Sequence, residues 1–376
     1  MKLALRLQLG VLLVGAAVTY MATWNIHMNR AKRVESGNNS SPLQPSSCHP
    51  ARSVVFLKMH KAGSSTVFNI LLRYAAEEGL ILALPNSATH FQHSTSKLFD
   101  PQKLLNLSVA GIQPSLVAMH MRMDREALLS VMLNETRFVT IMRRPVDLFR
   151  SLYDYYALQR HFGDEPLEEF VFNDDHVRAL QETRFAGNLG FNQMAFDLGM
   201  HPAHFDDHDK VEELISTVQS TFDVVMVAER FTESLVLLRK KLCLPSLRSV
   251  VVFRKNALQN RTTLTPRVAA RLAQLNAADT RIYEHFARRL QSQLHALGDQ
   301  SVASEVARIE ATTRHWLERC VESTTTGRRV VAHRLREGMD YDATCHRLAL
   351  SEIEFTKELR WAQTRLARQR TGFFYH

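Results

Sequence analysis

The sequence lacks several features that would define its class at once. It holds no internal repeat and no long low-complexity tract, which excludes solenoid and fibrous architectures, and its 14 glycines and 11 prolines are ordinary numbers for 376 residues. The net charge of +9 suggests nucleic acid as a partner, but no zinc finger, RNA-binding aromatic signature or basic helical arm accompanies it. We therefore expect no nucleic-acid partner. With 45% apolar residues, the chain can bury the core of one large α/β domain or two modest ones.

Cysteine is also scarce, because the chain has only four. If all four are oxidised, three pairings are possible. We expect Cys320 to pair with Cys345, which closes a short loop and stabilises the fold by roughly 3 kcal/mol in the chain-entropy model. Cys48 and Cys243 are a weaker second pair, and four buried thiols are the alternative.

The N-terminus carries one hydrophobic run, at residues 7–24, which is close to the minimum length that spans a bilayer. A signal peptide cleaved near Ala22 is the alternative. Basic residues lie on both sides of the run, so they do not orient it. We expect a cytoplasmic tail at 1–6, a signal-anchor helix at 7–24, a polar stem at 25–52 and a catalytic domain at 53–376.

The orientation comes from glycosylation sequons on the C-terminal side of this run. Five Asn-X-Ser/Thr triplets occur there, at Asn38, Asn39, Asn106, Asn134 and Asn260. Together with the cysteines and the hydrophobic start, they favour a body in the lumen of the secretory pathway. The chain is thus expected to be a single-pass type II membrane protein.

The rest of the chain alternates strand-like and helix-like segments. Buried strands are predicted at 53–59, 137–142, 222–228 and 250–253, and helices at 64–79, 146–160, 233–242, 266–297, 302–320 and 351–368. This alternation predicts an α/β fold with a mostly parallel sheet flanked by helices. Ligands of such sheets bind beyond the carboxyl ends of the strands.

A phosphate-binding loop is predicted where the first strand meets the first helix, in the segment from Lys58 to Thr66. The N-terminal N–H groups of a helix bind phosphate, Gly63 allows close approach of the backbone, and Lys61 adds a full charge. The segment is not the nucleotide-triphosphatase signature, because the first glycine is missing and the lysine precedes the glycine. An ordinary Ser/Thr helix cap is the alternative.

A second anion site is predicted after the strand at 137–142. Arg143 follows this strand, and Ser151 lies eight residues further on. Guanidinium geometry suits bidentate phosphate binding. A donor with phosphates at both ends of a ribose needs two such pockets.

These two segments together resemble the sulfotransferases that use 3′-phosphoadenosine 5′-phosphosulfate (PAPS). The run Phe56–Thr66 looks specifically like the galactose-3-O-sulfotransferases, a family that includes the cerebroside sulfotransferase. The resemblance extends over nearly the whole body, through the segments 120–122, 192–197, 228–239 and 345–347.

The resemblance implies a role for each motif residue. Arg143 and Ser151 would bind the 3′-phosphate, and no metal would be needed. The 5′-phosphosulfate would be held by Lys58, Lys61, Ala62, Gly63, Ser64, Ser65 and Thr66. Ala62 stands where a threonine is commoner and Arg144 where asparagine or aspartate is often found, while the tryptophan of the wider superfamily is absent. No adenine-stacking residue can therefore be named.

The acceptor hydroxyl needs a general base, and histidine titrates near the working pH. Of the 17 histidines, the family motifs place His60 and His120 near the site. The sequence does not decide between them, and either can instead cap or pack. Lys61 is expected to stabilise the leaving phosphate; Lys58 either assists it or lies in solvent.

The sequence therefore predicts a Golgi membrane sulfotransferase with a lumenal catalytic domain. It would act on a galactose-terminated glycolipid or glycoprotein glycan; the acceptor class and the oligomeric state stay open. A nucleotide-dependent phosphotransferase and an inactive membrane-anchored glycan-binding protein are the alternatives. The cluster of His201, His204 and His208 is interpreted as a solvated loop, not as a metal site. The tyrosines at 153, 155 and 156 are expected to pack on a helix face, with stacking on a sugar or base as the alternative.

Overall fold

The computed structural model describes residues 48–86, 97–253, 263–326 and 331–372. The predicted tail and anchor, and the stem up to residue 47, lie outside these ranges, as do the sequons at Asn38, Asn39 and Asn260. Among the described residues, none of the helices has both the length and the apolar character needed to cross a membrane.

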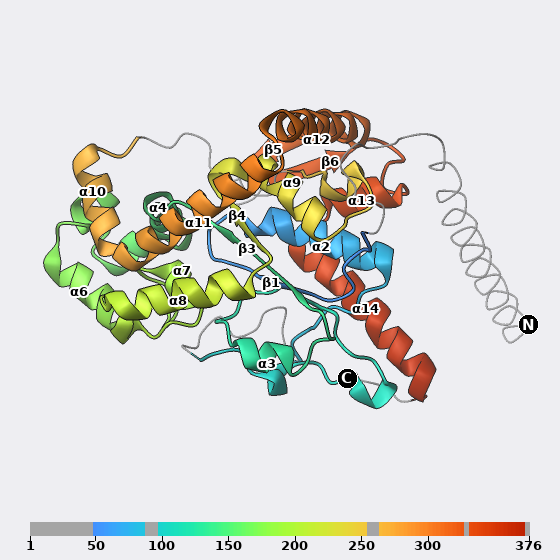
Figure 1. Cartoon of the computed structure of the whole chain (residues 1–376), viewed down its shortest axis with the longest axis horizontal. Helices are drawn as coiled ribbons and strands as arrows, with labels where there is room; N and C mark the ends of the chain where they lie inside the picture. Colours follow the sequence, from blue (N-terminus) through green and yellow to red (C-terminus); the bar gives the residue numbers. More distant parts are fainter. Residues whose placement is uncertain (1–47, 87–96, 254–262, 327–330, 373–376) are drawn as a thin grey trace, which may run out of the picture. The chain divides into compact units, whose positions relative to one another are not determined.

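A four-stranded parallel sheet forms the centre of the fold (Figure 1). The strands β1 (Val54–Leu57), β2 (Leu116–Val117), β3 (Arg137–Met142) and β4 (Val224–Val227) lie in the order β2-β1-β3-β4. Except for the first residue of β3, every strand residue is buried, as expected for a sheet covered on both faces. The predicted α/β class with a parallel sheet is thus confirmed, and the carboxyl ends of β1 and β3 meet at one edge.

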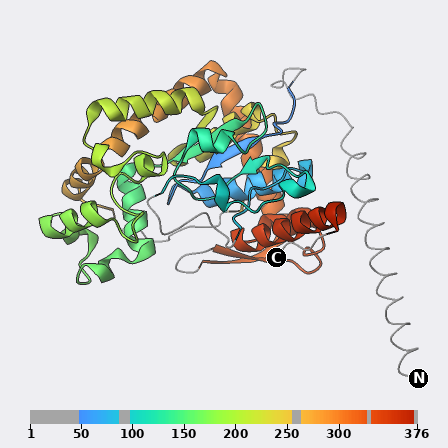
Figure 2. The same cartoon turned by 90° about the horizontal axis from the view of Figure 1, so that it is seen from below.

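Helices surround this sheet, and several far apart in sequence lie side by side. The terminal helix α14 (Glu352–Thr371) contacts α2 (Ser64–Glu78), and α11 (Ala277–Ala296) contacts β4 (Figure 1). Seen from below, α14 in red and α11 in orange lie on opposite sides of the central strands (Figure 2). The other α-helices are α3 (Arg125–Leu129), α4 (Pro145–Tyr156), α5 (Leu167–Phe170), α6 (Asp174–Thr183), α7 (Gln193–Asp197), α8 (His208–Thr221), α9 (Phe231–Lys241), α10 (Pro266–Leu275), α12 (Asp299–Cys320) and α13 (Ala343–Ala349).

A separate aromatic core holds α4 against the helices that follow it. Phe149 stacks on Phe191 at 4.4 Å between ring centroids, and Tyr153 packs against Phe170. The hydroxyl of Tyr153 donates to the carbonyl of Glu165 at 2.6 Å. Tyr153 therefore packs on a helix face as predicted, and this core fixes the direction of α4 beside β3.

Two predicted elements are wrong. The strand predicted at 250–253 is absent: Val250 ends a short 3₁₀-helix, Leu247–Val250, and residues 251–253 have no regular structure. The backbone carbonyls of Arg248, Ser249 and Val251 accept hydrogen bonds from the buried guanidinium of Arg73 instead of from a strand partner. The single helix predicted at 266–297 is two helices, α10 and α11, divided at Asn276. A third element was missed: the strands β5 (Val321–Thr326) and β6 (Val331–Leu335) form an antiparallel pair.

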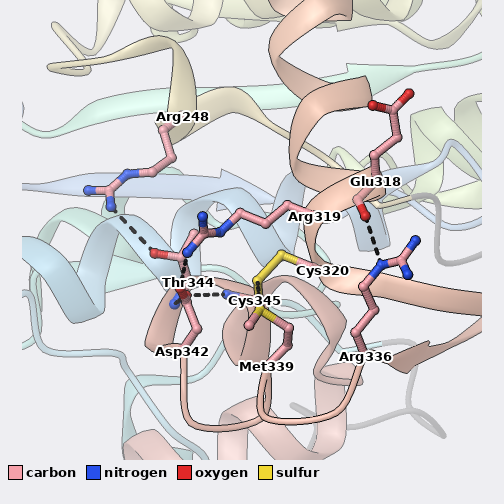
Figure 3. Close-up of a disulfide and its surroundings, with 9 residues drawn as sticks. All are labelled: Arg248, Glu318, Arg319, Cys320, Arg336, Met339, Asp342, Thr344 and Cys345. Atoms are coloured by element: carbon pink, nitrogen blue, oxygen red, sulfur yellow. Dashed lines mark hydrogen bonds and ion pairs between the residues drawn. A yellow bond between two sulfur atoms is a disulfide. The ribbon is translucent and has the colours of Figure 1, made fainter.

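The predicted disulfide between Cys320 and Cys345 is present, and it fixes the end of α12 to α13 (Figure 3). Asp342 caps α13 by accepting hydrogen bonds from the N–H groups of Thr344 and Cys345 at 2.9 and 3.0 Å. Arg319 forms an ion pair with Asp342 at 3.2 Å, next to the disulfide.

The weaker predicted pair, Cys48 with Cys243, is also present. The N–H of Ala51 donates to the carbonyl of Leu242 at 3.0 Å, and the hydroxyl of Tyr74 donates to the carbonyl of Ala51 at 2.6 Å. Residues 48–52, predicted as the end of the stem, are therefore bound to the body.

Candidate active site

The predicted phosphate loop connects β1 to α2 and folds tightly. Lys61 and Gly63 both have left-handed backbone angles, with φ of 54° and 80°. Residues other than glycine rarely adopt this backbone conformation, and such backbone strain tends to occur at functional sites. A Cβ at Gly63 would meet no atom within 4 Å, so the space beside this residue is open. The loop thus presents its backbone to a ligand.

The first turn of α2 lies at the positive end of the helix dipole, and the N–H of Thr66 donates to the carbonyl of Gly63 at 3.2 Å. Gly63 is its N-cap and contributes no side-chain cap. The hydroxyl of Ser64 turns back into the loop and donates to the carbonyl of Met59 at 2.7 Å, so Ser64 closes the loop. Ser65 and Thr66 are partly exposed at the same turn, while Ala62 is buried. The residues predicted to bind an anion thus lie together at the start of α2, and their role stays a prediction.

Two cationic side chains flank the loop. Arg143 at the end of β3 donates to the carbonyl of Lys61 at 2.9 Å, which joins the two predicted anion sites. The ammonium of Lys61 lies over the ring of Tyr155 at 3.3 Å from its centroid. Tyr155, expected to pack on its helix face or else to stack on a sugar or base, contacts the donor-loop lysine. Ser151 lies on α4 with a buried side chain.

His60 is buried beside the loop and is held by Asp197 of α7. The backbone N–H of His60 donates to Oδ2 of Asp197 at 2.9 Å, and the ring Nδ1 lies 2.9 and 3.0 Å from the two carboxylate oxygens. An ionised carboxylate only accepts hydrogen bonds, so Nδ1 carries the proton. The Nε2 of the neutral ring then has a lone pair, and this buried atom has no hydrogen-bond partner among the described residues.

Asp197 is in turn held by a buried polar network. Gln193 donates from Nε2 to Oδ1 of Asp197 at 2.9 Å, and Arg184 donates to Oε1 of Gln193 at 2.9 Å. Burial lowers the pKa of Arg184 to about 10, while Asp197 and Asp279 act to raise it. The positive guanidinium stabilises the negative charge on Asp197.

Asp279 of α11 binds the backbone of the first turn of α7. Its carboxylate accepts hydrogen bonds from the N–H groups of Met194 and Ala195 at 2.9 and 2.8 Å. Burial raises the pKa of Asp279 to about 7, the two backbone donors oppose this, and the nearby charge of Asp197 adds to it. The position of Asp197 thus depends on a contact between α7 and α11.

His120 follows β2 and stacks on His60, with 4.3 Å between ring centroids and 20° between planes. Its Nδ1 lies 2.7 Å from the carbonyl oxygen of Lys58, which only accepts, so Nδ1 carries the proton. Its Nε2 lies 3.1 Å from Nζ of Lys58 and accepts from this ammonium. The lone pair of His120 is therefore engaged, whereas that of His60 is available.

Lys58 is not in solvent, as one interpretation of the sequence had it. Its side chain is 5% exposed, and its ammonium forms an ion pair with Glu352 of α14 at 3.0 Å. No local pattern in the sequence indicates this partner, because Glu352 is one of many charged residues in a polar helix. Asp197 carries a weak signal, since a lone carboxylate follows the apolar Met194-Ala-Phe196, but this pattern alone does not indicate its role.

The histidine-rich segment at 201–208 is a polar surface loop. His201 accepts a hydrogen bond from the N–H of Ala203 at 3.2 Å, and His208 is exposed beside Asp209. Within the ranges that the structure describes, no three His, Cys, Asp or Glu residues are grouped as a metal site would require. The two described sequon residues, Asn106 and Asn134, are exposed.

Comparison with known proteins shows the family to which the chain belongs. The family model described as galactose-3-O-sulfotransferase matches residues 1–337. The chain belongs to the galactose-3-O-sulfotransferase family. The family predicted from the motifs of the donor loop is thereby confirmed, and so is the class of enzyme, a sulfotransferase.

Individual members of the galactose-3-O-sulfotransferase family show the extent of the likeness. The chain is 30% identical over 347 residues to human galactose-3-O-sulfotransferase 2, covering 82% of the chain and 83% of that protein. It is 33% identical over 293 residues to bovine galactose-3-O-sulfotransferase 3, covering 74% and 66%. It is 29% identical over 286 residues to bovine galactosylceramide sulfotransferase, covering 73% and 65%. The chain thus spans about two thirds of the length of these two bovine relatives.

Proposed function

We propose that this protein transfers a sulfuryl group from PAPS to the 3-hydroxyl of a β-linked galactose on a glycolipid or glycoprotein. The observation that carries the proposal is the arrangement of His60: its Nδ1 is held by Asp197, and its buried Nε2 lies unpartnered beside an anion-binding loop. A hydroxyl acceptor needs such a base next to the donor.

The residues around the loop fit the proposed donor. Open space at Gly63, the positive end of the α2 dipole and the ammonium of Lys61 suit a 5′-phosphosulfate. Arg143, which already contacts the loop, and Ser151 are proposed for the 3′-phosphate. Tyr155, under the Lys61 ammonium, would keep this cation at the mouth of the loop in the absence of an anion.

The donor, when bound, supplies an electrophilic sulfur: the acceptor oxygen forms the new S–O bond, the bond from sulfur to the phosphate oxygen breaks, and adenosine 3′,5′-bisphosphate leaves. His60 Nε2 accepts the proton of the attacking hydroxyl. Asp197 stabilises the imidazolium that results, as a carboxylate does for a catalytic histidine elsewhere. Lys61 and the helix-terminal amides stabilise the charge on the leaving phosphate.

His120 is proposed to orient the acceptor and the ring of His60 instead of taking the proton. Its Nε2 already accepts from Lys58, so it would have to lose this hydrogen bond to act as a base. Its stacking on His60 fixes the plane of the catalytic ring.

One assay tests the proposal as a whole. The full chain is incubated with sulfur-labelled PAPS and a panel of acceptors: galactosylceramide, lactose, N-acetyllactosamine and a 3-deoxygalactoside. We expect label on the β-galactosides and none on the 3-deoxy compound. Labelling of the 3-deoxy compound would refute the position of transfer. Transfer of phosphate from ATP, with none of sulfate from PAPS, would favour the phosphotransferase alternative.

The role of Asp197 has a test of its own. Asp197→Asn removes the charge that stabilises the imidazolium, so kcat should fall by about 10²–10⁴-fold, the contribution of a general base. The acidic limb of the pH–rate profile should also move to lower pH, because the protonated ring has lost its carboxylate partner. A merely structural role would not move this limb, and an unshifted profile would refute the assignment.

We also propose that residues 7–24 anchor the protein in the Golgi membrane with its body in the lumen. Two disulfides and the exposed sequon residues Asn106 and Asn134 support an oxidising, glycosylating compartment. Protease protection and glycosidase treatment of the full chain in intact microsomes test this. A body that is digested without detergent, or that carries no glycan, would contradict it.

A further inference from the structure

The two groups that contact the ring of His60 come from segments far apart in the chain. Asp197, at the end of α7, lies 2.9 Å from the ring Nδ1 with its nearer carboxylate oxygen. His120, which follows β2, stacks on the face of the same ring at 4.3 Å between centroids. Both contacts exist only while α7 and the segment after β2 keep a fixed position relative to each other.

Arg122 joins these two segments. It lies two residues after His120 and is 8% exposed. Its guanidinium donates hydrogen bonds to three carbonyls, those of Phe196, Gly199 and Met200, at 3.2, 3.1 and 3.0 Å. All three carbonyls lie at or just beyond the C-terminal end of α7. One buried side chain therefore connects the end of α7 to the segment that carries His120.

The two backbones also approach each other closely at this junction. The N–H of Met123 donates to the carbonyl of Asp197 at 2.8 Å. Gly199 has a positive φ of 99°, and a Cβ at this residue would lie 2.5 Å from the carbonyl oxygen of Met123. Only glycine allows this approach without a shift of the backbone. The junction is thus closed by main-chain contact as well as by the guanidinium.

The junction also places positive charge beside the carboxylate. Burial lowers the pKa of Arg122, and the negative charge of Asp197 opposes this shift. The guanidinium carbons of Arg122 and Arg184 lie 4.1 and 4.0 Å from the ring centroid of Phe196. Because Phe196 directly precedes Asp197, both cations pack against the residue next to the carboxylate.

We propose that Arg122 is a positioning residue for the proton transfer: by fixing the end of α7, it keeps Asp197 hydrogen-bonded to the ring of His60. It acts through Asp197 and not on the donor or the acceptor. The inference rests on the proposed function for the role of His60 as the base, whereas the contact that it explains is measurable without turnover.

The first test observes the His60 ring directly by nitrogen NMR. The full chain is labelled with ¹⁵N in its histidines, and the ring signals of His60 are assigned by their absence in His60→Ala. At a pH at which the ring is neutral, wild type should show one tautomer, with the proton on Nδ1. In Arg122→Ala the two ring signals should move toward each other, because a ring without its carboxylate partner exchanges between both tautomers.

The second test separates positioning from a general loss of stability. Arg122→Ala should lower kcat by about 10–100-fold, the effect of a small displacement of a reacting group, with nucleotide affinity as in wild type. In the Asp197→Asn background, the same substitution should lower kcat no further, because its effect acts through the carboxylate. An equal loss of kcat in both backgrounds would show a merely structural role and would overturn the inference.

Two further variants test the same junction if Arg122→Ala does not fold. Arg122→Lys keeps the charge but cannot bind three carbonyls at once, so it should show both effects more weakly. Gly199→Ala acts from the α7 side, since its Cβ displaces the carbonyl of Met123, and should show both effects as well. Nucleotide affinity equal to that of wild type shows that each variant is folded.

Arg289→Ala is the matched control. Arg289 is half-buried, and its guanidinium donates to the carbonyls of Gln219 and Phe222 at the end of α8, each at 3.2 Å. It therefore holds the end of another helix in the same manner, away from the two histidines. The control should lose stability and leave both the His60 signals and kcat unchanged.

The outcomes separate this inference from the proposed function. Wild-type ring signals in the folded variants of Arg122 and Gly199 would overturn the inference, even if wild type transfers sulfate. Shifted signals in these variants, with wild-type signals in Arg289→Ala, would support it, even if no sulfate is transferred. In that case the proposed function would fail and the positioning of Asp197 by Arg122 would stand.

Discussion

The donor side and the proton-transfer side of the site are built in different ways. The donor loop is one continuous segment between Lys58 and Thr66, and its partner Arg143 comes from the neighbouring strand. The proton-transfer side joins His60 to Asp197, 137 positions away, and Lys58 to Glu352, 294 positions away. The first depends on local backbone geometry, and the second depends on the packing of α7 and α14 against the sheet.

This difference determines what a substitution should do. On the donor side, charges and backbone amides act on a ligand directly, so a substitution should change affinity. On the proton-transfer side, buried partners orient one another, so a substitution should change the rate or the pH dependence. The following predictions test this distinction, from the largest expected effect to the smallest.

His60→Ala should have the largest effect. Loss of the general base should lower kcat by about 10²–10⁴-fold while the affinity for adenosine 3′,5′-bisphosphate stays close to wild type. His120→Ala should mainly raise the acceptor KM, because its Nε2 is engaged by Lys58. Steady-state kinetics with a galactoside and calorimetry with the nucleotide measure both. If the severe kcat loss occurred at His120 instead, the assignment of the two histidines would be reversed.

Lys61→Ala and Arg143→Ala should each weaken nucleotide binding by about 10–100-fold, since hydrogen bonds to charged groups contribute roughly 1.5–3 kcal/mol. Isothermal titration with adenosine 3′,5′-bisphosphate measures the change. Arg144→Ala is the control, because Arg144 is exposed and pairs with Asp147 at 3.5 Å. Wild-type affinity in both test variants would exclude the two-site donor model.

Asp279→Asn should change how stability depends on pH. Burial raises the folded-state pKa of Asp279 from 3.8 to about 7, so the folded protein binds the extra proton between these values. The stability from this proton is fully present below pH 3.8 and is lost as the pH rises through about 7. The asparagine variant has no such proton to lose.

The comparison of Asp279→Asn with wild type should therefore depend on pH. The variant should gain on the order of 1 kcal/mol or more, relative to wild type, between pH 5 and pH 8. Urea unfolding at the two pH values measures this, with Asp175→Asn on the surface, where the partner is Arg178, as the control. A difference that is the same at both pH values would mean that Asp279 does not change its protonation state between pH 5 and pH 8, and would contradict the raised pKa.

Chelation should have the smallest effect. The charges proposed to stabilise the leaving phosphate belong to Lys61 and to the N-terminus of α2, so activity in excess EDTA should equal that in buffer. Loss of sulfate transfer that only a divalent ion restores would show that the donor side is incomplete without a metal.

Parts of the fold could be predicted because the signal was local. The strand at 137–142 and the helix between Gly63 and Gly79 follow from an apolar run and from helical spacing between two glycines. The apolar run at 250–253 gave the same signal and is not a strand, because the side chain of Arg73 satisfies its neighbouring carbonyls. An apolar run indicates that a segment is buried, but it does not indicate which groups form hydrogen bonds with its backbone.

By itself, the sequence determined the donor loop, the parallel sheet, the family and the two candidate bases, because each depends on residue types at short and fixed spacings. The tertiary structure decided which histidine has an available lone pair. That choice depends on what lies against each Nδ1 and Nε2: Asp197 from α7 at one ring, Lys58 with Glu352 from α14 at the other. Such contacts between distant segments form only when the helices pack on the sheet, and no spacing along the chain encodes them.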